Sequence, residues 1–381
     1  MGKTQKPVGV TTTLYKKNSN NRLQIWQITT HQGKFLTTEG LIDGKLTTSA
    51  WTYCEGKNIG RSNETTPHEQ AIREAAAKVT KKLEQGYYYS QEDAGRGKQF
   101  IEPMLAHKYS TFKALPGEHL SQPKLDGIRN ICDGITNKSR KGKEFVCLPH
   151  LLDPAKALIK RIEEISNVTV IALDGEAYNH RLKDDFNAIT SLVKKTKPTP
   201  NDLSLAKELM EYCIYDIITE EELTNKERAA ILRKAFKSKK FPHLVRVPTK
   251  TIHTEEQLNN LYLEYLSNGY EGQMLRLSSA IYHRGRTKSL LKRKETLDDE
   301  CKVIGITEGI GNASGLAASA TCIHPNGQQF DANIMGPASF RAELLRRRES
   351  FIGKMATIKY QNLTPGGKPR FPRLLTFRDY E

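Results

Sequence analysis

Alternating apolar and polar residues predict a sheet at the start of the chain, followed by one helix. Positions 23–28, Leu-Gln-Ile-Trp-Gln-Ile, alternate with a period of two, as a half-buried strand does. The segment 66–69, Thr-Pro-His-Glu, then supplies an N-cap, a proline for the first turn and a capping-box acid. Apolar residues keep a helical spacing over 72–83 until Gly86 stops the pattern. Residues 1–88 therefore predict a small α+β domain.

Strands and helices are mixed over residues 99–298, without the regular alternation of a parallel βαβ fold. The residue spacing predicts helices over 148–165 and 203–211 and strands over 168–178, 212–218 and 271–277. The preceding segment 89–98 is polar and contains glycine, which predicts a linker. We therefore expect a central domain that begins near residue 99.

Short strands dominate the chain from residue 299 onward. The pattern predicts strands over 301–307, 354–361 and 373–378, a hairpin that turns at 325–327 and a helix over 337–348. Several short strands with one helix fit a small barrel. The sequence thus predicts a third domain over 299–381.

Net charge points to a class of partner. The chain has 381 residues, with 59 Lys or Arg against 43 Asp or Glu, which gives a net charge of +16. The excess divides as +6 over residues 1–98, +7 over 99–298 and +3 over 299–381. A charge spread over all three parts favours one long polyanion, such as nucleic acid, that each part contacts. The other interpretation is that the surface lysines serve solubility alone.

Signals for other classes of protein are missing from the sequence. No apolar run approaches the roughly 20 residues of a membrane span, and the charged start lacks an apolar signal core. The six cysteines are scattered and form no Cys-x-x-Cys pair. We therefore expect reduced thiols, no zinc, no membrane contact and a cytoplasmic location.

The strongest chemical signal is the segment 122–129, Gln-Pro-Lys-Leu-Asp-Gly-Ile-Arg. A lysine attacks only when its amine is neutral, which desolvation and neighbouring cations favour by lowering its pKa. Pro123 and Gly127 form turns around Lys124, and Arg129 is a nearby cation that can also bind phosphate. An ordinary surface turn is the alternative interpretation.

Two carboxylates follow the apolar segment 170–173. Asp174 and Glu176 are two residues apart on a predicted strand, so they project to one side and can bind a ribose or Mg²⁺. A solvated strand end is the alternative. Further on, Tyr215 is an aromatic that can stack on a purine, with nearby Tyr212 as a rival and a core tyrosine as the alternative for either.

Charged residues of both signs lie on the strands that follow. Glu271 begins a predicted strand, a position that suits a metal ligand. Lys292 and Lys294 share one face of a strand and are aimed together at an anion. Lysine pairs are common on exposed strands, so this pair is informative only in combination with the other motifs.

In this order the motifs resemble the covalent nucleotidyltransferase superfamily, most closely the compact ATP-dependent DNA ligases of viruses and phages, over residues 99–381. The resemblance implies a multidomain α+β protein. An ATP-grasp-like adenylation domain of antiparallel sheets and helices would fill 99–298, and an OB-fold β-barrel would fill 299–381. The segment 366–373, Gly-Gly-Lys-Pro-Arg-Phe-Pro-Arg, looks like the final motif of the viral enzymes.

The resemblance also implies a role for each matching residue. Lys124 would carry the covalent AMP, and Arg286 would meet DNA phosphate. The residues implied to bind ATP are Gln122, Arg129, Arg140, Glu176, Tyr215, Lys292, Lys294 and Arg370. Those implied to hold a divalent metal are Asp174, Glu176 and Glu271.

The N-terminal segment 57–63, Lys-Asn-Ile-Gly-Arg-Ser-Asn, resembles a WGR-type DNA-binding module, with Ile59 where that family has tryptophan. This second resemblance implies added affinity for DNA, with Arg61 at a phosphate, and no chemistry.

The implied activity is sealing of nicks in duplex DNA by a monomer that uses ATP with Mg²⁺ or Mn²⁺, in the host-cell cytoplasm if the protein is viral. RNA end joining and mRNA capping are rivals from the same superfamily, and the Arg-Phe-Pro ending argues against them. An NAD⁺-dependent ligase would continue into a zinc site. A non-catalytic DNA-binding scaffold is the rival from another class. Five intact residues argue against it, namely Lys124, Glu176, Glu271, Lys292 and Lys294.

Overall fold

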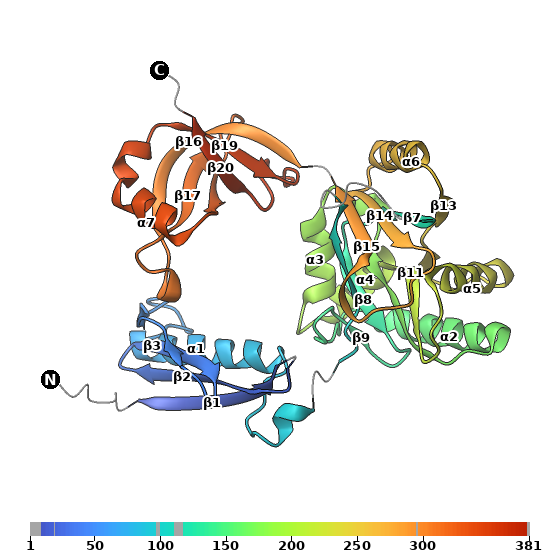
Figure 1. The fold of residues 1–381 in the computed structure, drawn as a ribbon, viewed down its shortest axis with the longest axis horizontal. Coiled ribbons are helices and arrows are strands. Elements are labelled where there is room, and N and C mark those ends of the chain that lie inside the picture. Colours follow the sequence, from blue (N-terminus) through green and yellow to red (C-terminus); the bar gives the residue numbers. More distant parts are fainter. Residues whose placement is uncertain (1–8, 19, 97–99, 110–116, 295, 379–381) are drawn as a thin grey trace. The chain divides into compact units, whose positions relative to one another are not determined.

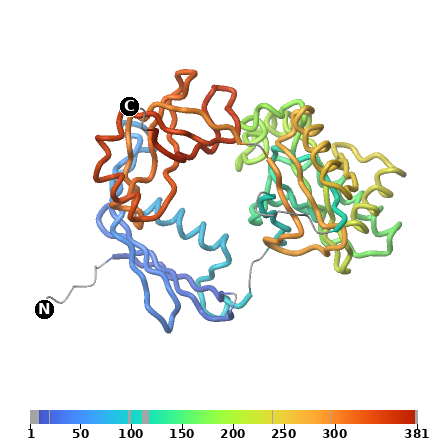
Figure 2. Tube along the Cα trace, turned by 45° about the horizontal axis from the view of Figure 1, so that its top comes forward, coloured from blue at the N-terminus to red at the C-terminus, as the bar shows by residue number. Residues whose placement is uncertain are grey.

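The structure is a computed structural model that describes residues 9–18, 20–96, 100–109, 117–294 and 296–378. The chain divides into two compact units, residues 100–296 and the combination of residues 1–99 with 297–381. The second unit holds two folds, an N-terminal sheet with a helix and a C-terminal barrel (Figure 1). The three folds can be followed by colour along the chain in Figure 2.

The N-terminal fold is a five-stranded antiparallel sheet with one helix against it (Figure 1). Its elements are β1 (Val10–Lys17), β2 (Leu23–His31), β3 (Lys34–Leu41), β4 (Thr47–Thr48), β5 (Thr52–Tyr53) and α1 (Pro67–Leu83). The core between sheet and helix contains Leu14, Trp26, Ile28, Phe35 and Ala75. The predicted capping box is confirmed, because the Thr66 hydroxyl accepts from the Glu69 amide and the Glu69 carboxylate accepts from the Thr66 amide.

Part of the segment that the sequence predicts as a linker packs against this fold. The short 3₁₀ helix η1 (Asp93–Gly95) lies in this segment, packs against β1 and buries Ala94. Just before the segment, Tyr88, the last residue of the predicted N-terminal domain, exchanges backbone hydrogen bonds of 2.7 and 2.8 Å with Tyr15 of β1. Polar composition does not reveal the packing of η1, because one small side chain makes it.

Two five-stranded sheets form the central unit (Figure 1). The first has the order β12-β11-β10-β8-β9 and the second the order β13-β7-β14-β15-β6. The strands are β6 (Met104–Lys108), β7 (His119–Lys124), β8 (Ile128–Cys132), β9 (Asn137–Lys138), β10 (Val170–Tyr178), β11 (Glu211–Thr219), β12 (Leu244–Arg246), β13 (Lys250–Ile252), β14 (Gly272–Leu277) and β15 (Gly285–Lys294). Neighbours are antiparallel except at one edge of each sheet, where β12 and β6 run parallel to β11 and β15. The three strands predicted in this region are confirmed as β10, β11 and β14.

Helices pack on both sheets. Those of the central unit are η3 (Pro149–Leu151), α2 (Leu152–Ser166), η4 (His180–Leu182), α3 (Phe186–Lys194), α4 (Pro200–Leu209), α5 (Asn225–Ser238) and α6 (Glu255–Ser267). α2 and α5 pack on β10 and β11 over the largest core, and α6 packs on β7 and β14. The two predicted helices are confirmed as α2 and α4, while α3, α5 and α6 were not predicted. α5 does carry a sequence signal, a capping box at Thr224 and Glu227.

The C-terminal fold is a closed five-stranded barrel in the order β16-β17-β18-β20-β19, as an OB-fold requires. Its elements are β16 (Leu297–Glu308), η5 (Gly311–Ala313), β17 (Ala317–Ile323), β18 (Gln329–Ile334), α7 (Ala338–Arg346), η6 (Arg348–Phe351), β19 (Met355–Tyr360) and β20 (Arg373–Arg378). β17 and β18 form the predicted hairpin, and Gly327 in its turn has a φ of 84°. The expectation of a small barrel with one α-helix is confirmed.

Candidate active site

Strand register gathers three lysines on one face of the second sheet. Gly272 of β14 pairs with Lys124 of β7 on one side and with Lys294 of β15 on the other. Met274, two residues on, pairs with Gln122 and Lys292 in the same way. Because residues two apart on a strand share a face, Lys124, Lys292 and Lys294 all point to one side.

One carboxylate lies among these lysines. Glu271 forms ion pairs with Lys124 and with Lys294, the second at 2.9 Å. Burial raises the pKa of Glu271, but Lys124 and Lys294 outweigh burial and hold that pKa below its ordinary value. The pKa of Lys292 is lowered, first by burial and then by Lys124 and Lys294. Three lysines against one acid leave a positive surface that suits a phosphate chain.

The first sheet brings a second carboxylate to the same place. Glu176 of β10 is close enough to Lys124 and Arg129 to feel their charges. Burial raises its pKa to about 7, although both cations act in the opposite direction. Gly127 makes room for it, since a Cβ there would lie 2.7 Å from the Glu176 Cγ and 2.6 Å from the Ala177 carbonyl oxygen. The glycine of the Lys-x-Asp-Gly motif is therefore required by packing.

Asp174 and Arg129 are committed to each other. The Arg129 guanidinium donates to the two Asp174 oxygens at 2.9 and 2.5 Å and to the Met104 carbonyl at 2.7 Å. The Tyr282 hydroxyl also donates to Asp174, at 2.7 Å. Asp174 is fully buried, so its oxygens lie among protein donors and away from solvent. The structure shows this pairing, and the metal-binding role of Asp174 and the ATP-binding role of Arg129 stay predictions.

The two candidate tyrosines face opposite ways. Tyr212 is fully buried in the core, with its hydroxyl 2.7 Å from the Leu173 carbonyl oxygen. Tyr215 is partly exposed, and its hydroxyl donates to Glu176 at 3.3 Å. The guanidinium carbons of Arg129 and Arg276 lie 5.6 and 5.4 Å from its ring centre. Tyr215 is therefore the aromatic that borders the candidate site.

The remaining predicted residues lie in several places. Gln122 is buried beside Tyr215, whereas Arg286 is exposed and donates to the Ala106 carbonyl at 2.6 Å. Arg370 and Arg61 belong to the other compact unit, where Arg370 donates to Asn362 at 3.3 Å and Arg61 is exposed in the loop before α1.

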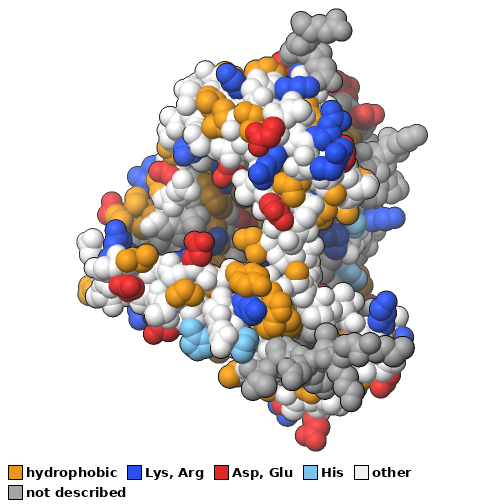
Figure 3. Space-filling view, turned by 90° about the vertical axis from the view of Figure 1, so that its left-hand side faces the viewer, with side chains coloured by type: hydrophobic (Ala, Val, Ile, Leu, Met, Phe, Trp, Pro, Cys, Tyr) orange, Lys and Arg blue, Asp and Glu red, His pale blue; other side chains and the backbone are white. Residues whose placement is uncertain are grey.

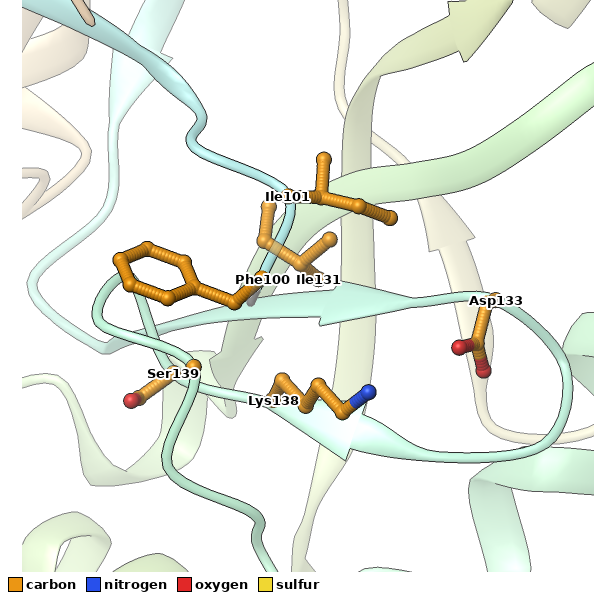
Figure 4. Close-up of a pocket in the computed structure, with 7 residues that line it drawn as sticks. Phe100, Ile101, Ile131, Asp133, Lys138 and Ser139 are labelled. Atoms are coloured by element: carbon orange, nitrogen blue, oxygen red, sulfur yellow. The ribbon is translucent and has the colours of Figure 1, made fainter. Parts of the chain in front are cut away.

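The loop that carries Arg140 borders a small pocket. Figure 4 shows Phe100, Ile101 and Ile131 on one side of this pocket and Lys138 and Ser139 on the other. A Cβ on Gly142 would lie 2.6 Å from the Phe100 ring, so the loop and the ring are in close contact. Arg140 itself is exposed. Phe100 thus supports the turn from which Arg140 projects.

Residues behind the site were missed by the sequence analysis. Arg276 and Asp216 are buried and joined by an ion pair of 2.5 Å. Strand alternation was the available signal, because Arg276 lies two residues beyond Met274 and so faces the side of the lysines. Asp216 pairs with Asp174 in the register of β10 and β11, which the sequence does not reveal.

The donor set fits one small divalent cation. Magnesium takes oxygen ligands and is typically held by one or two carboxylates together with substrate phosphates and water. Glu176 and Glu271 supply such oxygens beside the lysines. The described residues contain no group of three or more His, Cys, Asp or Glu side chains that could hold a metal. A metal here would therefore depend on the nucleotide for much of its coordination.

Two protein families match the chain. The ATP dependent DNA ligase domain matches residues 103–294, and the DNA ligase OB-like domain matches residues 308–378. The matches coincide with the two-sheet unit and with the barrel. No helix in the described part of the chain has the length and apolar character needed to cross a membrane.

Relatives and solved structures agree with these matches. The DNA ligase of African swine fever virus (isolate Tick/Malawi) is 27% identical over 91% of this chain and 83% of its own length. That of Haemophilus influenzae is 29% identical over 70% of this chain and 89% of its own length. A structure from an analysis of Lig E DNA ligases is 25% identical, with a TM-score of 0.60 over 73% of this chain and 100% of its own.

A second structure, Pmar-Lig, supports the fold alone, with 19% identity and a TM-score of 0.65 over 82% of this chain and 81% of its own. The matched ligase domain covers about half of the chain, and the OB-like domain follows it. The chain therefore belongs to the ATP-dependent DNA ligase family.

Proposed function

We propose that this ligase seals nicks in duplex DNA with Lys124 as its nucleophile. The Lys124 amine attacks the α-phosphate of ATP, so that a P–N bond forms, a P–O bond breaks and pyrophosphate leaves. AMP then passes to the 5′-phosphate of the nick, and the 3′-hydroxyl displaces AMP to join the strand. The observation that carries this proposal is the position of Lys124 beside Glu271, in one row with Lys294.

Each transfer builds negative charge on a phosphorus centre, which positive groups stabilise without moving. Lys292 and Lys294 fit this role at the α-phosphate because strand register places them beside Lys124. Tyr215 would stack on adenine, and Glu176 would bind the ribose. Arg140 projects from its loop as a further ribose contact.

Glu271 and Glu176 would hold Mg²⁺ or Mn²⁺, which neutralises charge on the triphosphate when bound. The Glu271 carboxylate is ionised near neutral pH, because Lys124 and Lys294 keep its pKa low. Lys124 meets the nucleotide as the ion-pair partner of this carboxylate. Its amine must lose a proton before attack.

The unit formed by residues 1–99 and 297–381 would contribute DNA contacts and one ATP contact. Arg370 would approach the pyrophosphate, and Arg286 of the central unit would meet a DNA phosphate. The WGR-like assignment of the N-terminal fold stays a prediction. It is supported by the exposed loop that carries Arg61 and by lysines beside aromatic rings, such as Lys34, whose Nζ lies 4.9 Å from the Trp51 ring centre.

Figure 3, which looks onto one side of the molecule, shows basic side chains interspersed with hydrophobic and acidic ones on the surface. The basic side chains can meet the phosphates of a DNA backbone. We also propose that the protein is a monomer. A cytoplasmic location is proposed as well, and it is supported by the six cysteines, which are free thiols in the structure.

Labelled nucleotide tests the chemistry directly. The full chain is mixed with Mg²⁺ and α-labelled ATP, GTP or NAD⁺, and then run on a denaturing gel. Wild type should give an adduct with ATP that acidic hydroxylamine removes and alkali leaves, as expected for a P–N bond. Lys124→Ala should give none.

Lys250→Ala is the matched control, since Lys250 lies on β13 of the same sheet and pairs with Glu264 at 2.8 Å. This variant should keep the adduct. A labelled band in Lys124→Ala, or none in wild type with ATP, contradicts the proposal. The rate of sealing is then compared between nicked DNA duplexes and nicked duplexes that contain RNA, which defines the substrate.

A further inference from the structure

A buried hydrogen-bond chain joins the two sheets behind the candidate ATP site. Arg276 of β14 donates through Nη1 to Asp216 of β11 at 2.5 Å and through Nε to the Gln122 side-chain oxygen on β7 at 2.9 Å. All three side chains are buried. One guanidinium therefore bridges the sheet that carries Tyr215 and the sheet that carries Lys124.

A second arginine fixes the far end of the chain. Arg228 of α5 is 1% exposed and donates to Asp216 at 2.7 and 3.2 Å. It also donates to the Leu223 carbonyl and to Asn225. Burial raises the pKa of Asp216, but Arg228 and Arg276 outweigh it, so the pKa stays below its ordinary value. Asp216 is thus an ionised anchor for Arg276.

This anchor determines how the Gln122 amide is turned. Because Arg276 can only donate, the Gln122 oxygen must face it. The Gln122 NH₂ group then donates to the Tyr215 carbonyl at 3.0 Å and to the Thr249 hydroxyl at 2.9 Å. The Thr249 hydroxyl donates in turn to the Val247 carbonyl at 3.2 Å.

The result is a fixed set of hydrogen bonds beside Tyr215. Both amide hydrogens of Gln122 have acceptors, and turning the amide over would bring its NH₂ group against Arg276, which offers no acceptor. The Tyr215 backbone is therefore tied to the sheet that carries Lys124.

We infer that Arg276, held by Asp216, is a positioning residue that fixes Gln122 and the Tyr215 backbone, and so sets the placement of the base relative to Lys124, on which discrimination between bases depends. The inference rests on the proposed function, in which Tyr215 stacks on the base. Arginine is needed at this position because two nitrogens of one planar group serve two partners, which a lysine ammonium on its flexible stem does not reproduce.

Arg276→Lys tests the inference because it keeps the charge beside Asp216 and loses the fixed donor to Gln122. Self-adenylation is measured with ATP and with GTP, and KM and kcat are separated. The KM for ATP should rise about tenfold, because the base site is no longer held in one arrangement before ATP binds. The ratio of kcat/KM for ATP over GTP should fall, and kcat for ATP should change much less than KM.

Two further variants make the test decisive. Thr249→Val removes the acceptor for the Gln122 NH₂ group, keeps the buried ion pairs, and should change KM and selectivity in the same direction. Arg293→Lys is the control, since Arg293 lies on β15 of the same sheet, donates to Asn259 and stacks on Tyr262. It should leave KM and selectivity unchanged.

Two results overturn the inference. One is that Arg276→Lys and Thr249→Val lower the thermal midpoint but keep wild-type KM and selectivity, as a purely structural role predicts. The other is that Arg293→Lys shifts KM as much as Arg276→Lys does. Absence of any adduct in wild type contradicts the proposed function instead, so the two failures are distinguishable.

Discussion

At the scale of single residues, the charge of the site is set by two acidic side chains among three lysines. Glu271 is shared by Lys124 and Lys294, and Glu176 lies nearby with a pKa close to neutrality. These two acids therefore differ in protonation near pH 7, as expected for groups with different tasks in one reaction. Two substitutions separate the effects of charge and of space.

Glu176→Gln tests the effect of charge on the reaction. The pKa of Glu176 is raised from 4.5 to about 7, mainly by burial, so ionisation is completed only above that pH. Self-adenylation by wild type should rise as pH passes through about 7, and the variant should be about a hundredfold slower, without this rise. Rates measured from pH 5.5 to 8.5 check this. A wild-type profile without a rise near pH 7 would contradict it.

The same substitution should stabilise the fold in alkaline buffer. An acid with a raised pKa binds its proton more tightly when folded, so stability is lost as pH rises from 4.5 to about 7. Gln carries no charge to bury and does not incur this loss. The thermal midpoint of Glu176→Gln should exceed that of wild type at pH 8, and the two should converge near pH 4, as scanning calorimetry can measure.

Gly127→Ala tests the effect of space. The added Cβ would lie 2.6 Å from the Ala177 carbonyl oxygen and 2.7 Å from the Glu176 Cγ, so β8 and β10 must move apart. We expect a thermal midpoint lower by several degrees and slower self-adenylation. Gly305→Ala in β16 is the control, because its nearest neighbour is Thr321 at 3.7 Å, an ordinary contact. Equal losses in both variants would argue against the packing explanation.

At the scale of elements, α5 carries one end of the buried chain behind the site. Its capping box joins Thr224 and Glu227, and the helix holds Arg228 against Asp216. α1 has the same kind of capping box in a different fold. This pair of helices allows a matched comparison.

Thr224→Ala should lower the free energy of unfolding by about 1 kcal/mol, because the Thr224 hydroxyl is lost as acceptor for the Glu227 amide. Amide hydrogen exchange should show the loss of protection in α5. Thr66→Ala should instead reduce protection in α1. Loss of protection in the same segment in both variants would contradict this assignment.

Much of the site was predictable because it follows short motifs on strands. Alternation alone places Lys292 and Lys294 on one face, and the motif order singles out Lys124 and Glu271, which the structure places side by side. The pairing of Arg129 with Asp174 was not predictable, since these residues are 45 positions apart in the sequence and meet only after β8 pairs with β10.

The choice between Tyr212 and Tyr215 also required the structure. β10 and β11 change register between Asp174 and Gly175, so counting by twos along the sequence fails at that point. Among the elements, α3, α5 and α6 were missed, whereas the barrel was predicted from its turns and short strands. Capping and turn residues thus predict where many helices and strands end. Which side chains meet across strands is decided by strand pairing, which the sequence does not reveal.

At the scale of the whole molecule, positive charge is distributed over every fold. Arg61→Ala should reduce the slope of log affinity against log salt by about one for nicked duplex DNA, as expected for one lost phosphate contact. Arg61→Lys should keep the slope. Fluorescence anisotropy between 50 and 300 mM salt measures both, and an unchanged slope in Arg61→Ala would remove this residue from the DNA interface.

Gly272 contributes no side chain, yet it lies between Lys124 and Lys294 where β7, β14 and β15 pair. Its φ is 152°, and a Cβ there would lie 2.2 Å from the Arg293 carbonyl oxygen. Any side chain at position 272 would therefore collide with the backbone of β15. Any substitution at position 124 would remove the proposed nucleophile. A library of random variants selected for nick sealing should retain glycine at 272 as strictly as lysine at 124, although glycine has no side chain with which to touch a substrate.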